Sequence, residues 1–379
     1  NSGWNWISLN VLNSNMDLNN LLDLTSANQG DYIKGQTTSS TFYDTGDGQW
    51  YPVWNMDIES LYLLNITNND ASILYQGTLA SIPDISIDVE AGWNWIGYMP
   101  NQSMEINVAL SNINPSNMDY LKGQTGSSTY YSSGNIWYPS ITLSPGSGYM
   151  LKSETSYSLI YSEVEEGRKY VSVDKLKNNK EFDYYNYEFN SSSIIELDMP
   201  HLNVSLDDKI VIYKNDEIRG IAYAEICPLN NKILFPLMIY SNEIKENDFY
   251  FKYYNSKLNR FYEIREKINF QKNDIRGNAE EPLILTDINM PFKYELSDPY
   301  PNPFNPVANI NLALMDEHNN FSLKIYDIRG RLVKEIYNGY INYGYHSFRW
   351  DGSSFASGVY LVHMVAGDNL FTKKITLLK

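Results

Sequence analysis

A repeated block of sequence divides the first half of the chain and constrains its fold more than any other feature. The segment Gly3–Ile7, Gly-Trp-Asn-Trp-Ile, returns as Gly92–Ile96. Three further blocks return in the same order, with all offsets between 87 and 89 residues. Such self-similarity indicates two copies of one module, which we assign to residues 1–86 and 87–165. The further blocks are Asp31–Thr37 with Asp119–Thr125, Trp50–Pro52 with Trp137–Pro139, and Ser60–Leu64 with Ser147–Leu151.

Each copy is predicted to contain several strands and one short helix. The alternation of Trp4 and Trp6 around Asn5 is typical of a strand. Residues 16–24 and 104–113 space their apolar side chains as a short amphipathic helix does. Residues 39–43 and 127–131 alternate small polar and aromatic residues before a Gly-containing turn and the Trp-Tyr-Pro segment, which predicts a hairpin in each copy.

The aromatic residues of the two copies admit two interpretations. Trp4, Trp6, Trp93 and Trp95 could stack on sugars, or they could supply the large apolar side chains that a small core needs. Because both members of a pair lie on one face of a strand, we favour the core. Exposure of two or more coplanar indoles in one copy would instead favour glycan binding. The candidate ligand-binding aromatics are Trp50, Tyr51, Trp54, Trp137 and Tyr138.

A third module is expected at residues 166–288. The charged segment 164–169 marks its beginning, and short apolar runs follow between polar turns. Regular short strands without helices predict a β-sandwich. The acidic pairs Asp207-Asp208 and Asp216-Glu217 are expected to be solvated, because no loop of alternating oxygen ligands for calcium surrounds them. The predicted strands are 209–213, 218–224, 233–240, 249–254 and 261–264.

A fourth module is expected at residues 289–379. The segment Tyr300–Pro306 cannot be a helix or a central strand, because its three prolines remove N–H donors and fix φ. The alternating runs that follow predict a second sandwich. Its predicted strands are 309–314, 321–326, 332–336, 346–350, 358–363 and 371–377.

The whole chain is therefore expected to be mostly β and multi-domain, with two tandem β-rich repeats, each with one short helix, followed by two immunoglobulin-like β-sandwiches. The 32 tyrosines and 8 tryptophans agree with this expectation, since aromatic side chains suit a pleated surface. The chain begins without Met or an apolar leader, so we expect a mature chain from which a signal peptide has been removed.

Charge and residue content exclude several classes of function. A net charge of -16 repels phosphate backbones, so nucleic acid is not expected as a partner. No run of 18 apolar residues predicts a membrane span. The four histidines lie singly, and the single cysteine, Cys227, sits among apolar neighbours like a core residue. We therefore expect no metal, no cofactor and no enzymatic activity.

Three parts of the chain resemble known families. The repeated Gly-Trp-Asn-Trp-Ile and Asp-Tyr-Ile/Leu-Lys-Gly-Gln-Thr blocks resemble a tandem module of large secreted proteins of Bacteroidetes, and residues from Asp216 to Leu285 are similar to an immunoglobulin-like module that follows it there. The last 80 or so residues closely resemble the C-terminal sorting domain of the type IX secretion system. The motif residues are Pro301, Asn302, Pro303, Phe304, Gly330, Trp350, Asp351, Gly352, Gly358 and Tyr360.

The sorting-domain resemblance implies export across the outer membrane by the type IX machinery and a place at the cell surface. We therefore expect a non-enzymatic structural or adhesive protein, with self-association into an extracellular filament or sheath as one form of that role. Its expected partners are further copies of itself or other surface proteins. The alternative is a carbohydrate-binding surface protein that uses exposed Trp residues.

Overall fold

The computed structural model describes residues 1–22, 27–44, 46, 48–68, 77–82, 84–162, 182–199, 204–286, 291 and 293–379. The protein is mostly β, as predicted: of the described residues, 53% lie in strands and 3% in helices. The chain forms two compact units, one from residues 1–199 and 203–286, the other from its C-terminal part, 287–379. The predicted module boundaries at 165/166 and 288/289 lie outside the described residues.

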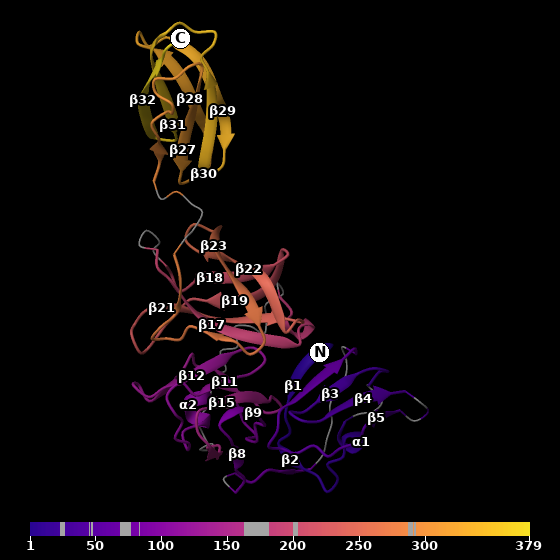
Figure 1. Ribbon diagram of the computed structural model, residues 1–379. Coiled ribbons are helices and arrows are strands. Elements are labelled where there is room, and N and C mark those ends of the chain that lie inside the picture. Colours follow the sequence, from indigo (N-terminus) through magenta and orange to yellow (C-terminus); the bar gives the residue numbers. More distant parts are fainter. Residues whose placement is uncertain are drawn as a thin grey trace. The chain divides into compact units, whose positions relative to one another are not determined.

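The two copies of the repeated module have sheets of the same topology (Figure 1). The strand order is β1-β6-β3-β4-β5 in the first copy and β9-β15-β11-β12-β13 in the second. Equivalent strands occupy equivalent places, and both predicted hairpins, β4–β5 and β12–β13, are present. The strands of the first sheet are Gly3–Ile7 (β1), Tyr62–Ile66 (β6), Tyr32–Lys34 (β3), Ser39–Tyr43 (β4) and Gln49–Tyr51 (β5); those of the second are Gly92–Ile96 (β9), Tyr149–Ser153 (β15), Tyr120–Lys122 (β11), Ser127–Tyr131 (β12) and Ile136–Tyr138 (β13).

Three strand pairs complete the copies. They are two-stranded ribbons, and each joins segments that lie far apart in the sequence. The pairs are Val11–Leu12 (β2) with Thr78–Leu79 (β7), Ile87–Val89 (β8) with Tyr157–Leu159 (β16), and Met104–Glu105 (β10) with Thr142–Leu143 (β14).

The helices α1 (Leu18–Leu21) and α2 (Ile106–Ala109) are present, but each has four residues and is shorter than predicted. In α1, the side chain of Asn19 accepts a hydrogen bond from the backbone N of Trp50 at 2.7 Å and donates one to the carbonyl oxygen of Trp50 at 3.3 Å. Asn107 of α2 makes the same pair of bonds with Trp137. Each helix therefore holds one strand in place, α1 the strand β5 and α2 the strand β13. A single helical turn is long enough to position the asparagine that makes these bonds.

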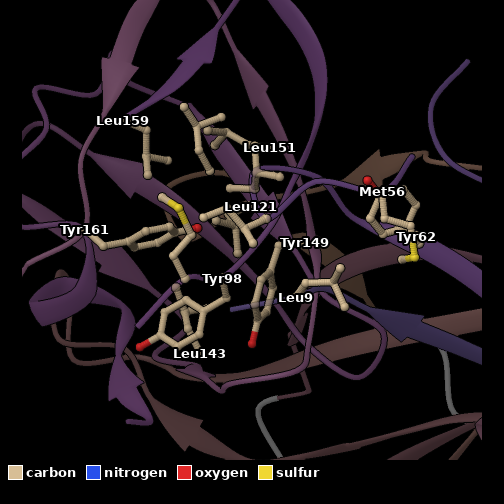
Figure 2. Packing of buried hydrophobic residues seen from close by; sticks show 14 of the residues in the cluster. Leu9, Met56, Tyr62, Tyr98, Leu121, Leu143, Tyr149, Leu151, Leu159 and Tyr161 are labelled. Carbon is tan, nitrogen blue, oxygen red and sulfur yellow. The ribbon is translucent and has the colours of Figure 1, made fainter. Parts of the chain in front are cut away.

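The two copies share one hydrophobic core. Buried residues of both copies form a single cluster, and Figure 2 shows Leu9 of the first copy close to Tyr149 of the second. The ring of Tyr98 packs edge-to-face with Tyr149 and Tyr161, at centroid distances of 6.2 and 5.1 Å. Such edge-to-face pairs add to the stabilisation from burial alone. The duplicated modules are therefore halves of one folded body.

A reciprocal pair of glutamines joins the copies. Gln36 of the first copy donates to the carbonyl oxygen of Trp93 and accepts from the backbone N of Trp95. The equivalent Gln124 of the second copy makes the same two bonds to the strand β1, at Trp4 and Trp6. The copies are thus related by an internal pseudo-twofold axis, as in an isologous dimer.

Residues 182–286 form two sheets, as the prediction of a sandwich required. One sheet has the order β20-β21-β17-β24, with β25 also on β17, and the other has the order β19-β18-β22-β23. The strand β17 was not predicted, and it pairs in parallel with β24 and β25. The immunoglobulin-like assignment stays a prediction. The elements are a 3₁₀ turn, Tyr184–Asn186 (η1), and the strands Phe189–Leu197 (β17), Lys209–Lys214 (β18), Glu217–Tyr223 (β19), Glu225–Ile226 (β20), Ile233–Ser241 (β21), Lys245–Asn255 (β22), Arg260–Gln271 (β23), Ile275–Arg276 (β24) and Leu283–Leu285 (β25).

The C-terminal unit is a separate sandwich of two sheets, with the orders β26-β27-β30 and β29-β28-β31-β32. All six predicted strands are present, and β26 is added to them. Its core contains Trp350, Phe304 and Tyr360. The strands are Glu295–Leu296 (β26), Val307–Leu314 (β27), His318–Asp327 (β28), Leu332–Ile341 (β29), Gly344–Asp351 (β30), Gly358–Ala366 (β31) and Asn369–Leu377 (β32).

Candidate functional site

Three of the five candidate ligand-binding aromatics are buried. Trp50 and Trp137 are 2% and 3% exposed, and their rings contact Phe42 and Tyr130 in the shared core. Tyr138 is 4% exposed. These three rings offer no face to a ligand, which corrects the expectation for them. For Trp50 and Trp137 the reason is the strand alternation, because they are the central residues of β5 and β13 and point into the core. Tyr138 lies on the opposite face of β13 and is covered by Ile194 and Leu234.

The two remaining candidates lie in the first copy. Tyr51 is 63% exposed, and Trp54 is half-buried and stacked on Tyr62 with ring centroids 5.5 Å apart. Trp54 is thus a single, partly covered indole, and the first copy has no pair of exposed coplanar indoles among these candidates. The exposed Tyr51 has the buried Tyr138 as its equivalent in the second copy, so the same residue type occupies two different environments.

The four Trp residues of the repeated motif lie between the copies. Trp6 is buried, and it packs in one cluster with Leu61 and Met150. Trp93 and Trp95 are half-buried against the same cluster. This placement agrees with the expectation that the four Trp residues have a packing role and do not form a sugar platform. They pack at the contact between the two copies and not within the core of a single copy.

The strongest contrast between the copies lies on the outer face of their sheets. In the second copy this face is covered by the sandwich of residues 182–286, where Tyr131 and Tyr138 cluster with Ile194, Cys227 and Leu234. We name it the docked face; its residues are Tyr120, Lys122, Ser127, Thr129, Tyr131, Ile136 and Tyr138.

The equivalent face of the first copy has almost the same residues and is largely open. Ser39, Tyr43, Gln49 and Tyr51 are exposed there. Only the Gln49 position differs in residue type from the docked face, where Ile136 replaces it. We name it the open face; its residues are Tyr32, Lys34, Ser39, Thr41, Tyr43, Gln49 and Tyr51.

The docked face is held by direct hydrogen bonds as well as by apolar packing. The hydroxyl of Tyr120 donates to the Ser192 Oγ at 2.6 Å, and the hydroxyl of Tyr131 accepts from the backbone N of Ala279 at 2.7 Å. The serine-rich strand β17 thus supplies the Ser192 hydroxyl to Tyr120, and the backbone at Ala279 supplies the partner of Tyr131. Both tyrosines bury their rings while their hydroxyls keep hydrogen-bond partners. Aromatic side chains in this arrangement stabilise an interface.

Lys122 is buried at the centre of the docked face. Its Nζ donates to the side-chain oxygens of Asn190 and Asn273, at 2.6 and 2.7 Å. The rings of Trp6 and Trp93 lie 5.6 and 5.5 Å from the same nitrogen. Neutral acceptors and aromatic rings thus surround the buried Lys122 amine.

The pH dependence of stability is expected to reveal Lys122. Burial, with a smaller contribution from the charge of Lys272, lowers the pKa of Lys122 to about 7, whereas an unfolded lysine has a pKa of about 10.4. Between these pH values the unfolded chain binds the proton more strongly, so the free energy of unfolding increases from pH 7 to pH 9. The slope from this group is at most about 1.4 kcal/mol per pH unit.

Chemical denaturation at several pH values measures this slope. The variant Lys122→Met should lose most of the increase, while Lys152→Met, a half-buried lysine on β15, should keep it. Equal slopes in the wild type and in Lys122→Met would contradict the assignment.

A cleft of about 630 Å³ lies beside the docked face, between the second copy and the sandwich of residues 182–286. Its lining includes Tyr149, Tyr184 and Tyr223 together with many Ser and Thr residues and the carboxylates Glu105 and Glu225. Glu105 is engaged in structure, because it caps α2 through Asn107 and accepts a hydrogen bond from Ser140. The cleft thus combines aromatic rings with hydroxyl groups.

The acidic residues considered for calcium have structural partners. Asp208 is buried, which corrects the expectation of a solvated side chain: it accepts hydrogen bonds from the backbone N of Ser205 and Ser256 and from the hydroxyl of Tyr253. Burial alone would raise the pKa of Asp208, but these hydrogen bonds outweigh it and lower the pKa. Asp216 accepts from Tyr250.

The part of the chain that the structure describes contains no cluster of three His, Cys, Asp or Glu side chains suited to a metal ion. His318 and His346 bond to Tyr294 and to the carbonyl oxygen of Asn342, while His201 lies outside the described residues. Cys227 is buried, as predicted. No helix of the described ranges has the length and apolar character needed to cross a bilayer.

The motif residues of the C-terminal unit hold its two ends together. Asn302 donates to the carbonyl oxygen of Lys374 and accepts from the backbone N of Thr376, so the entry segment is fixed to the last strand. A Cβ on Gly352 would lie 2.9 Å from the ring of Phe304, which explains why glycine is needed there. The hydroxyl of Tyr360 donates to the carbonyl oxygen of Ala356.

The remaining motif residues also have structural positions within the C-terminal unit. The Trp350 ring packs 4.9 Å from Phe304, and Gly330 has a φ of 76° in the turn after β28. Pro301 and Pro303 lie in the entry segment, Asp351 accepts a hydrogen bond from Ser353, and Gly358 begins β31.

Residues 299–378 match the family model of the secretion system C-terminal sorting domain. This C-terminal unit is a type IX sorting domain. The chain is therefore a secreted protein of the cell surface. The sorting domain also implies an interaction with the type IX secretion machinery.

No curated protein matches the chain. Among solved structures, dimeric latent PorU from Porphyromonas gingivalis is similar with a TM-score of 0.18 and 14% identity, over 69% of this chain and 29% of that one. The Bacillus anthracis TIE protein is similar with a TM-score of 0.17 and 12% identity, over 93% of this chain and 68% of that one. TM-scores this low do not define a shared fold.

Proposed function

We propose that the chain is a non-enzymatic structural or adhesive protein of the bacterial cell surface, whose N-terminal unit associates with other proteins, including further copies of itself. The observation that carries the proposal is the open face of the first copy. It repeats, nearly residue for residue, a face that binds a β-sandwich in the second copy, and its tyrosines Tyr43 and Tyr51 are exposed. Exposed tyrosines are well suited to anchor an interface, because they bury much area at low entropic cost.

The way in which the N-terminal unit is held together also favours a structural role. The two copies are joined by a common core and by the Gln36 and Gln124 bonds. The sandwich of residues 182–286 is joined to the second copy by the buried Lys122, Tyr120 and Tyr131. Such contacts suit a structural role, because they hold the three parts in one compact unit.

Sedimentation velocity and negative-stain imaging of the purified full-length chain test the proposal. The sedimentation coefficient should increase with protein concentration, and images at high concentration should show ordered assemblies that repeat by one subunit. A chain that remains a monomer at the highest attainable concentration would contradict self-association and leave adhesion to a different molecule.

The second candidate function is glycan binding, which the cleft beside the docked face favours. Tyrosine rings can stack on the CH groups of a sugar while serine and threonine hydroxyls bond to its OH groups. The platform would consist of tyrosines instead of the tryptophans expected from the sequence. In a glycan array and calorimetry, Tyr184→Ala should weaken binding about tenfold or more. Absence of any glycan ligand would contradict this candidate.

A further inference from the structure

We infer that the type IX secretion machinery binds the sorting domain through the outer face of the sheet β29-β28-β31-β32. This contact is independent of the self-association proposed above, because it serves the export of the chain and not its assembly. We name the surface the sorting-domain outer face. Its apolar residues are Tyr326, Leu332, Val359, Leu361, Val365 and Leu370.

The strand β31 shows which side of this sheet faces outward. Its residues Tyr360, Val362 and Met364 are buried in the core of the C-terminal sandwich. Because successive side chains of a strand point to opposite faces, the alternate residues of β31 point away from that core. Three of the four outward side chains are apolar. The four are Val359, Leu361, His363 and Val365.

The outward side of β31 differs from that of its two neighbours, β28 and β32. Most of the residues opposite it on those strands are polar. A sheet with one solvated face normally alternates apolar and polar residues, whereas a strand that is largely apolar on both sides is typical of a sheet covered on both sides. The outward side of β31 therefore predicts a partner. The opposite residues are Ser322, Lys324 and Tyr326 on β28, and Leu370, Thr372, Lys374 and Thr376 on β32.

The apolar side chains form one patch that crosses the sheet. Leu361 lies directly opposite Tyr326 of β28, which lies opposite Leu332 of β29. At the other end of β31, Val365 lies opposite Leu370 of β32. Residues that are directly opposite in this way share one face of the sheet. Leu332 and Leu370 are 54% and 63% exposed, and a contiguous exposed apolar patch of this kind marks an interaction site.

The place of the patch within the sorting domain favours the secretion machinery as its partner. The motif residues Phe304 and Trp350 are 1% exposed and pack on each other, so no partner can reach them. The machinery therefore has to bind residues on the surface of this domain. The patch lies within the matched residues 299–378, and its strand β31 begins at the motif residue Gly358.

The turn at one end of the patch is ordered before any partner binds. It joins β28 to β29, and its Asp327 carboxylate accepts hydrogen bonds from the backbone N of Arg329 and of Arg331. Ile328, in the same turn, is 73% exposed. An ordered backbone reduces the entropic cost of association. We therefore expect Ile328 to extend the contact.

Export of full-length variants from a bacterium with a type IX system tests the contact. The variant Leu332→Glu/Val359→Glu places two charges in the patch and should lower the exported fraction about tenfold or more, because these charges would lose water in the contact. The matched control Tyr345→Glu/Ser347→Glu places two charges at exposed positions of β30, in the other sheet, and should be exported like the wild type. Immunoblots of the cell-surface and internal fractions give the exported fraction.

A milder variant separates recognition from folding. Leu332→Gln/Val359→Thr keeps side chains of similar size on both strands but makes them polar, and it should still lower export several-fold. Hydrogen exchange over residues 293–379 of the purified variants checks that the sorting domain remains folded. Normal export of a folded patch variant, or an equal loss of export in the control, would overturn the inference.

A photo-crosslinking residue at position 332 identifies the partner in cells during export. Cross-links to a protein of the type IX machinery are expected at this position and not at position 345. Cross-links to a second copy of the chain or to residues 1–286 of the same chain would show that the patch has a different partner. Absence of any cross-link from an exported chain would likewise contradict the inference, while the proposed self-association of the N-terminal unit would be unaffected.

Discussion

Replacing Tyr131 by alanine should lower the free energy of unfolding by about 3–5 kcal/mol, whereas the same change at its equivalent, Tyr43, should alter it by less than about 0.5 kcal/mol. Tyr131 is fully buried and its hydroxyl accepts from the backbone N of Ala279. Its removal creates a cavity in the docked face and leaves a buried N–H without a partner. The Tyr43 side chain, by contrast, is 41% exposed.

Chemical denaturation of the dilute full-length chain, followed by hydrogen exchange in β17 and β21, measures the difference. The duplication supplies a matched control, because both substitutions remove the same atoms from equivalent strands. Similar losses at the two positions would contradict the description of one docked and one open face.

Replacing Trp350 by alanine should lower the free energy of unfolding of the sorting domain by about 3–5 kcal/mol. The indole is 1% exposed and contacts Phe304, Phe355 and Tyr360. The surrounding core relaxes only partly into the space that a removed side chain leaves, so a cavity remains.

Hydrogen exchange over residues 293–379 reports this loss without interference from the N-terminal unit. The control is Tyr345→Ala on the same strand β30, where the side chain is 63% exposed and the expected change is below about 0.5 kcal/mol. Unchanged protection in Trp350→Ala would show that the ring is not a part of the core.

The sequence predicted most of the architecture because its strongest signals are local. The repeated Gly-Trp-Asn-Trp-Ile blocks indicated two copies, whose sheets have the same strand order. Strand alternation located β4, β12 and the six strands β27–β32 of the sorting domain, but not β26. The helices were predicted too long, since the apolar spacing of residues 16–24 and 104–113 does not reveal that Asn19 and Asn107 bind a neighbouring strand.

The strand β17 was missed for a physical reason. Its sequence, Phe-Asn-Ser-Ser-Ser-Ile-Ile-Glu-Leu, contains three consecutive serines in place of alternating apolar residues. Ser191, Ser192 and Ser193 are nevertheless buried, because the strand lies against the second copy of the module, where Tyr120 bonds to Ser192. A strand whose outer face meets another domain has no simple pattern of burial in its sequence.

The difference between the open and docked faces was beyond the reach of sequence analysis. Tyr51 and Tyr138 stand in identical Trp-Tyr-Pro segments, so local pattern assigns them the same environment. Only the tertiary position of residues 182–286 makes one of them a buried anchor and leaves the other exposed.

Tyrosine-specific chemical labelling, read by mass spectrometry at low and high protein concentration, tests the central claim most directly. At low concentration Tyr43 and Tyr51 should be labelled rapidly while Tyr131 and Tyr138 remain protected, and at high concentration Tyr51 should become protected as copies associate. Rapid labelling of Tyr138 would contradict the docked face, and labelling of Tyr51 that is independent of concentration would contradict its role in association.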